Sequence, residues 1–413
     1  MQNIRWAVLG TGVIANEMAV ALKKNGRNID AVGNRTHEKA VAFAEKYGIK
    51  KVYDNYNDMF TDPDIDVIYI TTPHNTHINF MRRAIENGKH ILVEKSITLN
   101  SRELDEAIAL ADKKGVVIGE AMTIYHMPIY KKLKEILESG KLGKVNLITM
   151  NFGSFKEYDM NNRFFNKNLA GGAMLDIGVY ALSFIRWFMD SKPDQLLSQV
   201  KPAPTGVDEQ AGLLLMNQEG QMASVMLSLH SKQPKRGMVS CEKGYIEIME
   251  YPRAWEARIT YTDSGETEMI QTGEHADALA YELADMEKAI RGDAECMHLD
   301  YTKDVMDMMT DSEKNGDFSI RRRCKLWYEN TSFFSGDVQG VGFRYRSFYI
   351  AQSLGLAGWV ENLWDGRVEM EVQGSEVSIR EMLARIQQQR WINVADMEIT
   401  EIPCEEERGF KIR

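Results

Sequence analysis

The sequence "IRWAVLGTGVIANEMAVALKKNG", residues 4–26, decides the fold of the N-terminal region. Residues 4–10 are apolar almost throughout, which is typical of a strand buried on both faces of a parallel sheet. A glycine-rich turn follows, and residues 14–26 have helical spacing with Gly26 as the stop. The stretch therefore predicts a strand, a tight turn and a helix.

The alternation of strand and helix patterns continues to residue 121. Further strands are predicted at "IDAVGNRT", "DVIYITTP", "HILVEKS" and "VVIGEAM", with helices at residues 37–48, 77–88 and 101–115. Strands and helices at this interval predict a doubly wound parallel α/β sheet, a Rossmann domain over residues 1–121.

Two further domains are predicted after this sheet. Residues 122–320 contain longer alternating strands, including a hairpin that turns at Glu219 and Gly220, followed by helices at 277–291 and 302–314. This pattern predicts an α+β domain with an open, mostly antiparallel sheet. Residues 322–413 read strand, glycine loop, helix, two strands, helix and strand, the βαββαβ order of a ferredoxin-like domain.

Composition excludes several classes of partner. A formal net charge of −10 without a basic stripe argues against a nucleic-acid surface. No apolar run approaches the roughly twenty residues of a membrane span, and the N-terminus lacks the apolar core of a signal peptide. The cysteines at 241, 296, 324 and 404 are scattered singly, which favours a reducing compartment and no metal site. We expect a cytoplasmic protein.

The turn "GTGVIA" predicts a dinucleotide site. Gly10 permits the tight turn, Gly12 lets the backbone approach a pyrophosphate, and Ala15 allows the helix to pack closely on the strand. Val13 and Ile14 begin the helix whose N-terminus faces that pyrophosphate. The alternative interpretation is a strand–helix turn without a ligand, but its place after the first strand of a βαβ series favours the nucleotide.

The end of the second strand indicates which nucleotide binds. NAD usually meets an acidic residue there, but this chain has Asn34 and Arg35. Arginine offers a permanently charged donor fork to a 2′-phosphate. NADP(H) is therefore favoured, with NAD(H) possible; the alternative is a solvent-facing arginine at the start of a loop.

Three residues, Lys95, Asp176 and Tyr180, are candidates for proton chemistry, and Glu94 is adjacent to the first of them. Glu94 and Lys95 end a parallel strand at the edge of the sheet where ligands bind, and Asp176 and Tyr180 lie four apart on one helix face. Tyrosine, with an unperturbed pKa of about 10, can move a proton if a cation such as Lys95 favours its anion. Asp176 and Tyr180 could equally be a helix start and a core tyrosine.

Residues 1 to about 320 resemble the glucose–fructose oxidoreductase/inositol dehydrogenase family (Gfo/Idh/MocA). The motifs "GTGVIA", "TTPHNTH", "VEKS" and "GGAMLDIGVYAL" carry the resemblance, and the last is most similar to the dihydrodiol and D-xylose dehydrogenase branch. The resemblance implies a catalytic set and two binding loops. The catalytic set is Lys95, Asp176 and Tyr180, the cofactor side adds Thr71, Pro73, His77 and Glu94, and Arg163 faces a sugar, polyol or diol substrate.

One residue departs from the family pattern. The family's usual Glu-Lys-Pro is Glu-Lys-Ser here, with Ser96 in place of proline. Proline tolerates a cis peptide cheaply, whereas another residue needs roughly 2.5–4 kcal/mol for it. We therefore expect a different backbone at Lys95.

The loop "GDVQGVGFRYRSF", residues 336–348, predicts a second anion site. Gly340 and Gly342 allow successive N–H groups to point inward, and Arg344 adds a cation. Asn362, on the next strand, could hold a water in line. The alternative is a structural glycine loop.

This stretch resembles the acylphosphatase family from residue 322 to 413. The resemblance implies that phosphate is bound by the loop residues Gln339, Gly340, Val341, Gly342, Phe343 and Arg344. It implies that Asn362 orients the attacking water, and that Asp337 stands where a basic residue is common.

The sequence as a whole predicts a bifunctional enzyme. An NAD(P)-dependent oxidoreductase, interconverting alcohol and carbonyl, would precede an acylphosphatase that hydrolyses acyl phosphates. Two alternatives stay open: a nucleotide-bound sensor in which only the hydrolase is active, and a dehydrogenase with an inert anion-binding module. Apolar faces on the hairpin strands predict a homodimer or higher homo-oligomer.

Overall fold

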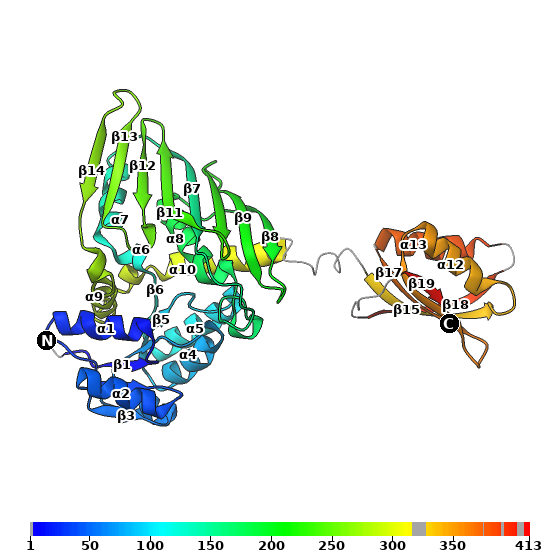
Figure 1. Cartoon of the computed structure of the whole chain (residues 1–413), viewed down its shortest axis with the longest axis horizontal. Helices are drawn as coiled ribbons and strands as arrows, with labels where there is room; N and C mark the ends of the chain where they lie inside the picture. The colour runs from blue at the N-terminus through cyan, green and yellow to red at the C-terminus, as the bar shows by residue number, and fades with distance from the viewer. Residues whose placement is uncertain (1–2, 316–327, 375, 390–391, 403–408) are drawn as a thin grey trace. The chain divides into compact units, whose positions relative to one another are not determined.

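The computed structural model describes residues 3–315, 328–374, 376–389, 392–402 and 409–413. The chain divides into two compact units, residues 1–316 and 317–413 (Figure 1). The predicted domain boundary at residues 320–322, together with Cys324 and Cys404, lies outside the described residues. Each unit is described by itself.

The N-terminal part of the first unit is the predicted doubly wound sheet. All strand pairs in it are parallel, in the order β3-β2-β1-β4-β5-β6. The strands are β1 (Trp6–Leu9), β2 (Ala31–Gly33), β3 (Lys51–Tyr53), β4 (Val67–Ile70), β5 (His90–Glu94) and β6 (Ile118–Ala121). The helices are α1 (Val13–Lys24), α2 (His37–Tyr47), α3 (Tyr56–Thr61), α4 (His77–Glu86) and α5 (Ser101–Lys114).

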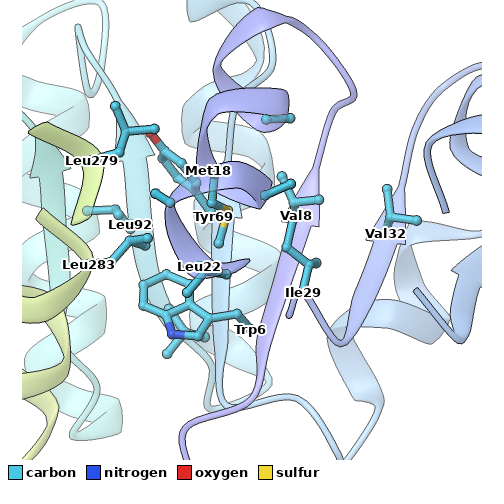
Figure 2. Packing of buried hydrophobic residues seen from close by; sticks show 14 of the residues in the cluster. Trp6, Val8, Met18, Leu22, Ile29, Val32, Tyr69, Leu92, Leu279 and Leu283 are labelled. Carbon is cyan, nitrogen blue, oxygen red and sulfur yellow. The ribbon is translucent and has the colours of Figure 1, made fainter. Parts of the chain in front are cut away.

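A helix from the following region completes the core of this sheet. Leu279 and Leu283 of α9 (Ala278–Ile290) pack beside Met18 of α1 and against Trp6 of β1 (Figure 2). The Trp6 indole N–H, which has no exposed surface, donates to a Glu287 carboxylate oxygen at 3.0 Å. Because buried polar groups need partners, this bond also fixes the position of α9 over the sheet.

The second sheet of this unit has eight strands in the order β14-β13-β12-β11-β7-β10-β9-β8. Only β7 and β10 pair in parallel, which confirms the predicted mostly antiparallel sheet. The strands are β7 (Val145–Gly153), β8 (Gln195–Pro202), β9 (Asp208–Met216), β10 (Met222–Ser228), β11 (Gln233–Cys241), β12 (Gly244–Met249), β13 (Glu256–Tyr261) and β14 (Thr267–Gln271).

Helices lie against one face of this sheet. Helix α8 (Val179–Phe188) contacts β7 and β11, and α10 (Leu299–Asn315) contacts β8 (Figure 1). Helices α6 (Thr123–His126) and α7 (Pro128–Glu138) connect the two sheets along the chain. Residues 167–188 are the one stretch, among those described, that is long and apolar enough to cross a membrane by length and composition. Its most apolar window is 61% buried inside the protein, as in a core helix.

The second unit has the predicted ferredoxin-like order and one additional short strand. Its sheet order is β18-β15-β17-β16-β19, with β16 and β19 parallel. The strands are β15 (Tyr328–Asp337), β16 (Ala357–Asn362), β17 (Val368–Gly374), β18 (Asn393–Ile402) and β19 (Phe410–Ile412). Helices α12 (Phe343–Ser353) and α13 (Glu376–Gln387) pack side by side, α12 against β16 and β19 and α13 against β17.

Candidate functional site

The glycine turn between β1 and α1 is positioned by three strand ends. The Gly10 N–H donates to the Gly33 oxygen at 2.8 Å, and the Thr71 N–H donates to the Leu9 oxygen at 2.9 Å. Gly10 has a φ of +113°, and a Cβ built on it would lie 2.5 Å from Thr71 Oγ1. A side chain here is therefore excluded by both conformation and space.

Gly12 differs from Gly10 because the space in front of it is open. Its φ is −75°, and a Cβ on it would meet no atom within 4 Å. Gly12 is also the N-cap of α1, so no side chain caps the first N–H groups of the helix. An open backbone surface at an uncapped helix N-terminus fits a pyrophosphate, so the residues present suit a dinucleotide.

The residues predicted to face the ribose follow β2. The Asn34 side-chain amide donates to the Thr36 oxygen at 3.0 Å, which orients the loop. Arg35 is exposed and lies near Tyr56, since its charge opposes the burial that raises the pKa of that tyrosine. The guanidinium is thus placed at the edge of the sheet where the ribose of a nucleotide lies.

Lys95 brings the predicted catalytic residues together. Its Nζ donates to the Asp176 backbone oxygen at 2.5 Å, lies 3.3 Å from Asp176 Oδ1 and lies 4.9 Å from the centre of the Tyr180 ring. Asp176 belongs to a π-helical turn (Met174–Gly178) that runs directly into α8. The side chains of Lys95 and Asp176 are each 13% exposed, so water screens their interaction little.

Electrostatics set the protonation of these groups. Burial alone would raise the pKa of Asp176, but Lys95 and Arg163 hold it below its ordinary value. Burial opposes the charge of Lys95, yet Asp176 and Tyr180 keep the pKa of the ammonium above its ordinary value. Asp176 is therefore an anion and Lys95 a cation at neutral pH.

The pKa of Tyr180 depends on burial as well as on the charge of Lys95. We expected the lysine to favour the tyrosine anion. Burial instead raises the pKa of Tyr180 to about 12, although Lys95 acts in the opposite direction. Desolvation of the half-buried phenol therefore outweighs the nearby cation, and the hydroxyl keeps its proton at neutral pH.

The backbone at Lys95 also corrects the sequence analysis. We expected serine at position 96 to set it differently, but the Lys95–Ser96 peptide bond is cis. Ser96 is fully buried and its hydroxyl donates to the Leu175 oxygen at 3.1 Å. The peptide is thus enclosed by contacts that the sequence did not show.

His77 connects this peptide to the preceding loop. Its Nδ1 lies 3.0 Å from the Ser96 oxygen and its Nε2 lies 2.8 Å from the Thr72 oxygen. The imidazole is completely buried, and burial lowers its pKa below the ordinary value. Glu94, which precedes Lys95 at the end of β5, accepts a hydrogen bond from the Tyr69 hydroxyl. His77 and Glu94 therefore hold the ends of strands in place.

A cavity of about 350 Å³ joins the glycine turn to Asp176. It is lined by Gly12, Val13, Ile14, Thr71, Thr72, Pro73, His74, Arg163, Phe164, Leu169, Ala170, Gly171 and Asp176. Five of the eleven predicted cofactor residues and two predicted substrate residues therefore line one space. Arg163 reaches it from a loop and lies 3.7 Å from Asp176 Oδ1.

Sequence reasoning missed two residues near this cavity. His74 lines it, and burial together with Lys95 lowers its pKa to about 3, so the ring is neutral. The signal available was its place in "TTPHNTH", between residues that the analysis did select. Lys156 was also missed, because a single lysine in a loop carries no motif.

The glycine loop of the second unit has the predicted conformation. Gly340 and Gly342 have φ values of +78° and +81°, the left-handed region. Among the residues described in this unit, no backbone oxygen accepts a hydrogen bond from the N–H groups of 339–342. These donors and the start of α12 form a concavity suited to an anion.

Hydrogen bonds from Gln339, and from Arg344 through Arg413, connect this loop to β16 and the residues that follow it. The Gln339 side-chain amide donates to the oxygens of Leu363 and Arg367, at 2.8 and 2.7 Å. Arg344 Nη1 donates to the Arg413 backbone oxygen at 2.9 Å, and the Arg413 N–H donates to the Val360 oxygen at 3.0 Å. Loop and strand are therefore held together.

Two predicted residues of this loop region remain exposed to solvent. Asn362, the last residue of β16, is exposed. It directly precedes Leu363, whose backbone oxygen accepts the hydrogen bond from Gln339. Asp337, just before the loop, is exposed and accepts from the Asn393 amide at 3.5 Å.

Comparison with protein families matches all three parts of the chain. Residues 4–122 match the oxidoreductase family with an NAD-binding Rossmann fold (GFO_IDH_MocA), residues 130–247 match the GFO/IDH/MocA C-terminal domain, and residues 331–412 match acylphosphatase.

Individual relatives agree with these matches. Trans-1,2-dihydrobenzene-1,2-diol dehydrogenase of Xenopus tropicalis is 32% identical over 248 residues, 59% of this chain and 74% of that protein. The Mus musculus enzyme of the same name is 31% identical over 253 residues, 60% of this chain and 75% of that protein.

Two solved structures share the fold of the first unit. A 3-ketoreductase from Actinomadura kijaniata, in complex with NADP and TDP-benzene, has a TM-score of 0.68 and 20% identity over 76% of this chain and 98% of that one. Levoglucosan dehydrogenase, in complex with NADH and levoglucosan, has a TM-score of 0.67 and 19% identity over the same shares.

Proposed function

We propose a bifunctional activity for this chain, which belongs to the Gfo/Idh/MocA oxidoreductase family and carries an acylphosphatase domain. The first unit interconverts an alcohol and a carbonyl on a sugar, polyol or diol, and the second hydrolyses acyl phosphates. The observation that carries the first activity is the position of Lys95, in contact with both Asp176 and the Tyr180 ring beside the nucleotide turn.

The dehydrogenase step needs a proton on the substrate oxygen. A bound nicotinamide dinucleotide supplies the hydride acceptor or donor. In the direction of reduction, Tyr180 donates its proton to the carbonyl oxygen, because its pKa of about 12 keeps it protonated. Lys95 then stabilises the phenolate, and Asp176 accepts a hydrogen bond from a substrate hydroxyl while holding Lys95.

NADP(H) is the proposed cofactor. A Rossmann domain that binds a nicotinamide dinucleotide is established by the family, and the preference follows from Arg35 in place of an acid after β2. An exposed guanidinium pairs with a 2′-phosphate through charge-assisted hydrogen bonds. NAD(H) retains the remaining contacts and binds more weakly.

The second unit binds the phosphate of an acyl phosphate at its glycine loop. The left-handed Gly340 and Gly342 aim N–H donors at the anion, and Arg344 contributes the cation. Asn362 positions a water for attack on phosphorus; the bond from phosphorus to the acyl oxygen breaks and a carboxylate leaves. The observation that carries this activity is the set of N–H groups of residues 339–342, just before α12, to which no backbone oxygen of the described residues is bonded.

A homodimer is the proposed assembly. The face of the eight-stranded sheet away from its helices carries apolar side chains that are largely exposed: Leu147, Leu197, Leu214, Met222, Met226, Tyr245, Met249 and Met269. They come from neighbouring strands, since Leu197 pairs with Leu214 and Met222 pairs with Leu147. The ion-paired Arg236, Glu247 and Arg258 lie on the same face, so an interface here would combine apolar and charged contacts.

A panel of aldoses, polyols and cyclic diols with NADP⁺ and NAD⁺ tests the first activity through nicotinamide absorbance, and acetyl and benzoyl phosphate test the second. We expect turnover by the full chain in both assays. Hydrolysis without any nicotinamide turnover, despite measurable cofactor binding, would favour the alternative in which the first unit is a nucleotide-bound sensor.

A further inference from the structure

Phe164, on the wall of the cavity beside Asp176, is flanked by two cations. The Lys156 Nζ lies 4.3 Å from the centre of its ring, and the Arg163 guanidinium carbon lies 4.4 Å from it. Phe164 and Arg163 both line the cavity that contains Asp176. The attraction of a cation to an aromatic face orients both side chains but leaves their charge in place.

Charge around this cavity does not balance. Asp176 already pairs with Lys95 at 3.3 Å and faces Arg163 at 3.7 Å. Among the residues that the structure describes, no carboxylate forms an ion pair with Lys156. Its charged neighbours are Asp176, which favours its ammonium form, and Arg163, Lys95 and Lys232, which oppose it. Two carboxylates, Asp176 and the Glu94 that also acts on Lys95, therefore face three nearby cations, while the neutral His74 adds no charge.

The backbone of Lys156 is fixed by hydrogen bonds, although the residue lies in a loop. Its N–H donates to the Leu229 oxygen at 2.8 Å, and its own oxygen lies 3.2 Å from His230 Nδ1. The residue is half-buried, and burial lowers the pKa of its ammonium. An unpaired, partly desolvated cation is costly to a protein, so such a position calls for an anion.

We infer that the substrate of the first unit carries an anionic group, a carboxylate or a phosphate ester, which lies against Lys156 and Arg163 beside Phe164. This inference rests on the proposed oxidoreductase function and names its substrate class. The alcohol carbon then lies toward Lys95 and Tyr180, and the anion neutralises the charge that Asp176 leaves uncompensated. Lys156 acts in recognition and moves no proton.

Matched substrates test the inference. D-glucose and D-galactose, their uronates and their 6-phosphates are assayed with NADP⁺ on the full chain carrying Arg344→Ala, so that the second unit does not hold the phosphate. We expect an anionic member to exceed its neutral parent in kcat/KM by about 10–100-fold, the range of a charge-assisted hydrogen bond. The better of uronate and phosphate ester identifies the anion.

Variants separate recognition from folding. Lys156→Gln should lower the ratio of kcat/KM for the anionic over the neutral sugar about 10–100-fold, mainly through KM, and Lys156→Arg should restore it. Lys113→Gln, at an exposed lysine of α5, is the matched control and should leave the ratio unchanged. Equal rates for neutral and anionic sugars in the wild type overturn the inference.

A binding measurement keeps the inference distinct from the proposed activity. The same six sugars are titrated calorimetrically into the NADP⁺-loaded Arg344→Ala chain and into its Lys156→Gln variant. Anion binding that depends on Lys156 without turnover supports the substrate class while the dehydrogenase proposal fails. Failure of every anionic sugar to bind overturns the inference, as does a variant that weakens NADP⁺ as much as the anion, because the cations then serve the cofactor.

Discussion

Oxidation of an alcohol by the first unit should accelerate about tenfold with each pH unit between pH 7 and pH 10. The reason is that oxidation requires the Tyr180 phenolate as base, and burial raises the pKa of this hydroxyl to about 12. From that pKa the phenolate fraction is about 10⁻⁴ at pH 8 and about 10⁻² at pH 10. Reduction uses the protonated form, whose fraction stays close to one, so its kcat/KM should be flat over the same range.

The assay follows nicotinamide absorbance in both directions across this pH range, with cofactor saturating. Tyr180→Phe should lower kcat by roughly 10²–10⁴-fold and abolish the slope, with cofactor affinity retained. Tyr245→Phe, a tyrosine on the exposed sheet face, is the matched control and should behave as the wild type. A flat oxidation profile in the wild type, or an unchanged slope in Tyr180→Phe, would refute the assignment of the proton to this residue.

The remaining predictions concern the two anion-binding turns. Arg35→Ala should weaken NADP(H) about 10–100-fold and NAD(H) about twofold or less in a fluorescence titration; equal losses would contradict the 2′-phosphate contact. Arg344→Ala should raise the inhibition constant of inorganic phosphate, and added salt should do the same in the wild type. Asn362→Ala should instead slow acyl phosphate turnover about 100-fold with phosphate inhibition retained, and the reverse pattern would exchange the two roles. Gly12→Ala should change the free energy of unfolding by less than about 1 kcal/mol yet weaken both cofactors about tenfold or more; unchanged affinity would show that no ligand approaches this backbone.

Most of the fold could be predicted because long helices and strands bury one face, which gives their apolar residues a regular spacing in the sequence. The strands at 67–70 and 90–94 are apolar runs that only a doubly covered parallel sheet accommodates. The sequence analysis missed β3, because its three residues Lys51–Tyr53 are all half-buried and too short to show a period. It also missed α3 (Tyr56–Thr61), since six residues carry less than two turns of a helical pattern.

The sequence predicted that three of the candidate site residues lie together, but it did not predict their protonation. Motif spacing selected Lys95, Asp176 and Tyr180, and the structure brings them into contact. The net pKa of Tyr180 depends on how much solvent the whole fold removes from the ring, a quantity that no local pattern contains. The surroundings of Lys156 could not be predicted either, because Leu229 and His230, which bind its backbone, are distant in sequence. Only the folded chain shows that no described carboxylate forms an ion pair with it.

Glycine is needed for different physical reasons at the positions of the two glycine turns. At Gly10 the fold itself requires it, because a Cβ would strike Thr71 and the φ of +113° strains any other residue. At Gly12 the fold does not require glycine, because the φ of −75° is accessible to any residue and no atom lies within 4 Å of a Cβ built there. The absence of a side chain therefore leaves room for a ligand. At Gly340 the space is open too, but a φ of +78° makes the conformation the constraint, and that conformation aims the N–H groups. The open space at the first turn suits an extended pyrophosphate, and the N–H donors directed by the second turn suit a compact phosphate, which is the basis of the two binding sites that we propose.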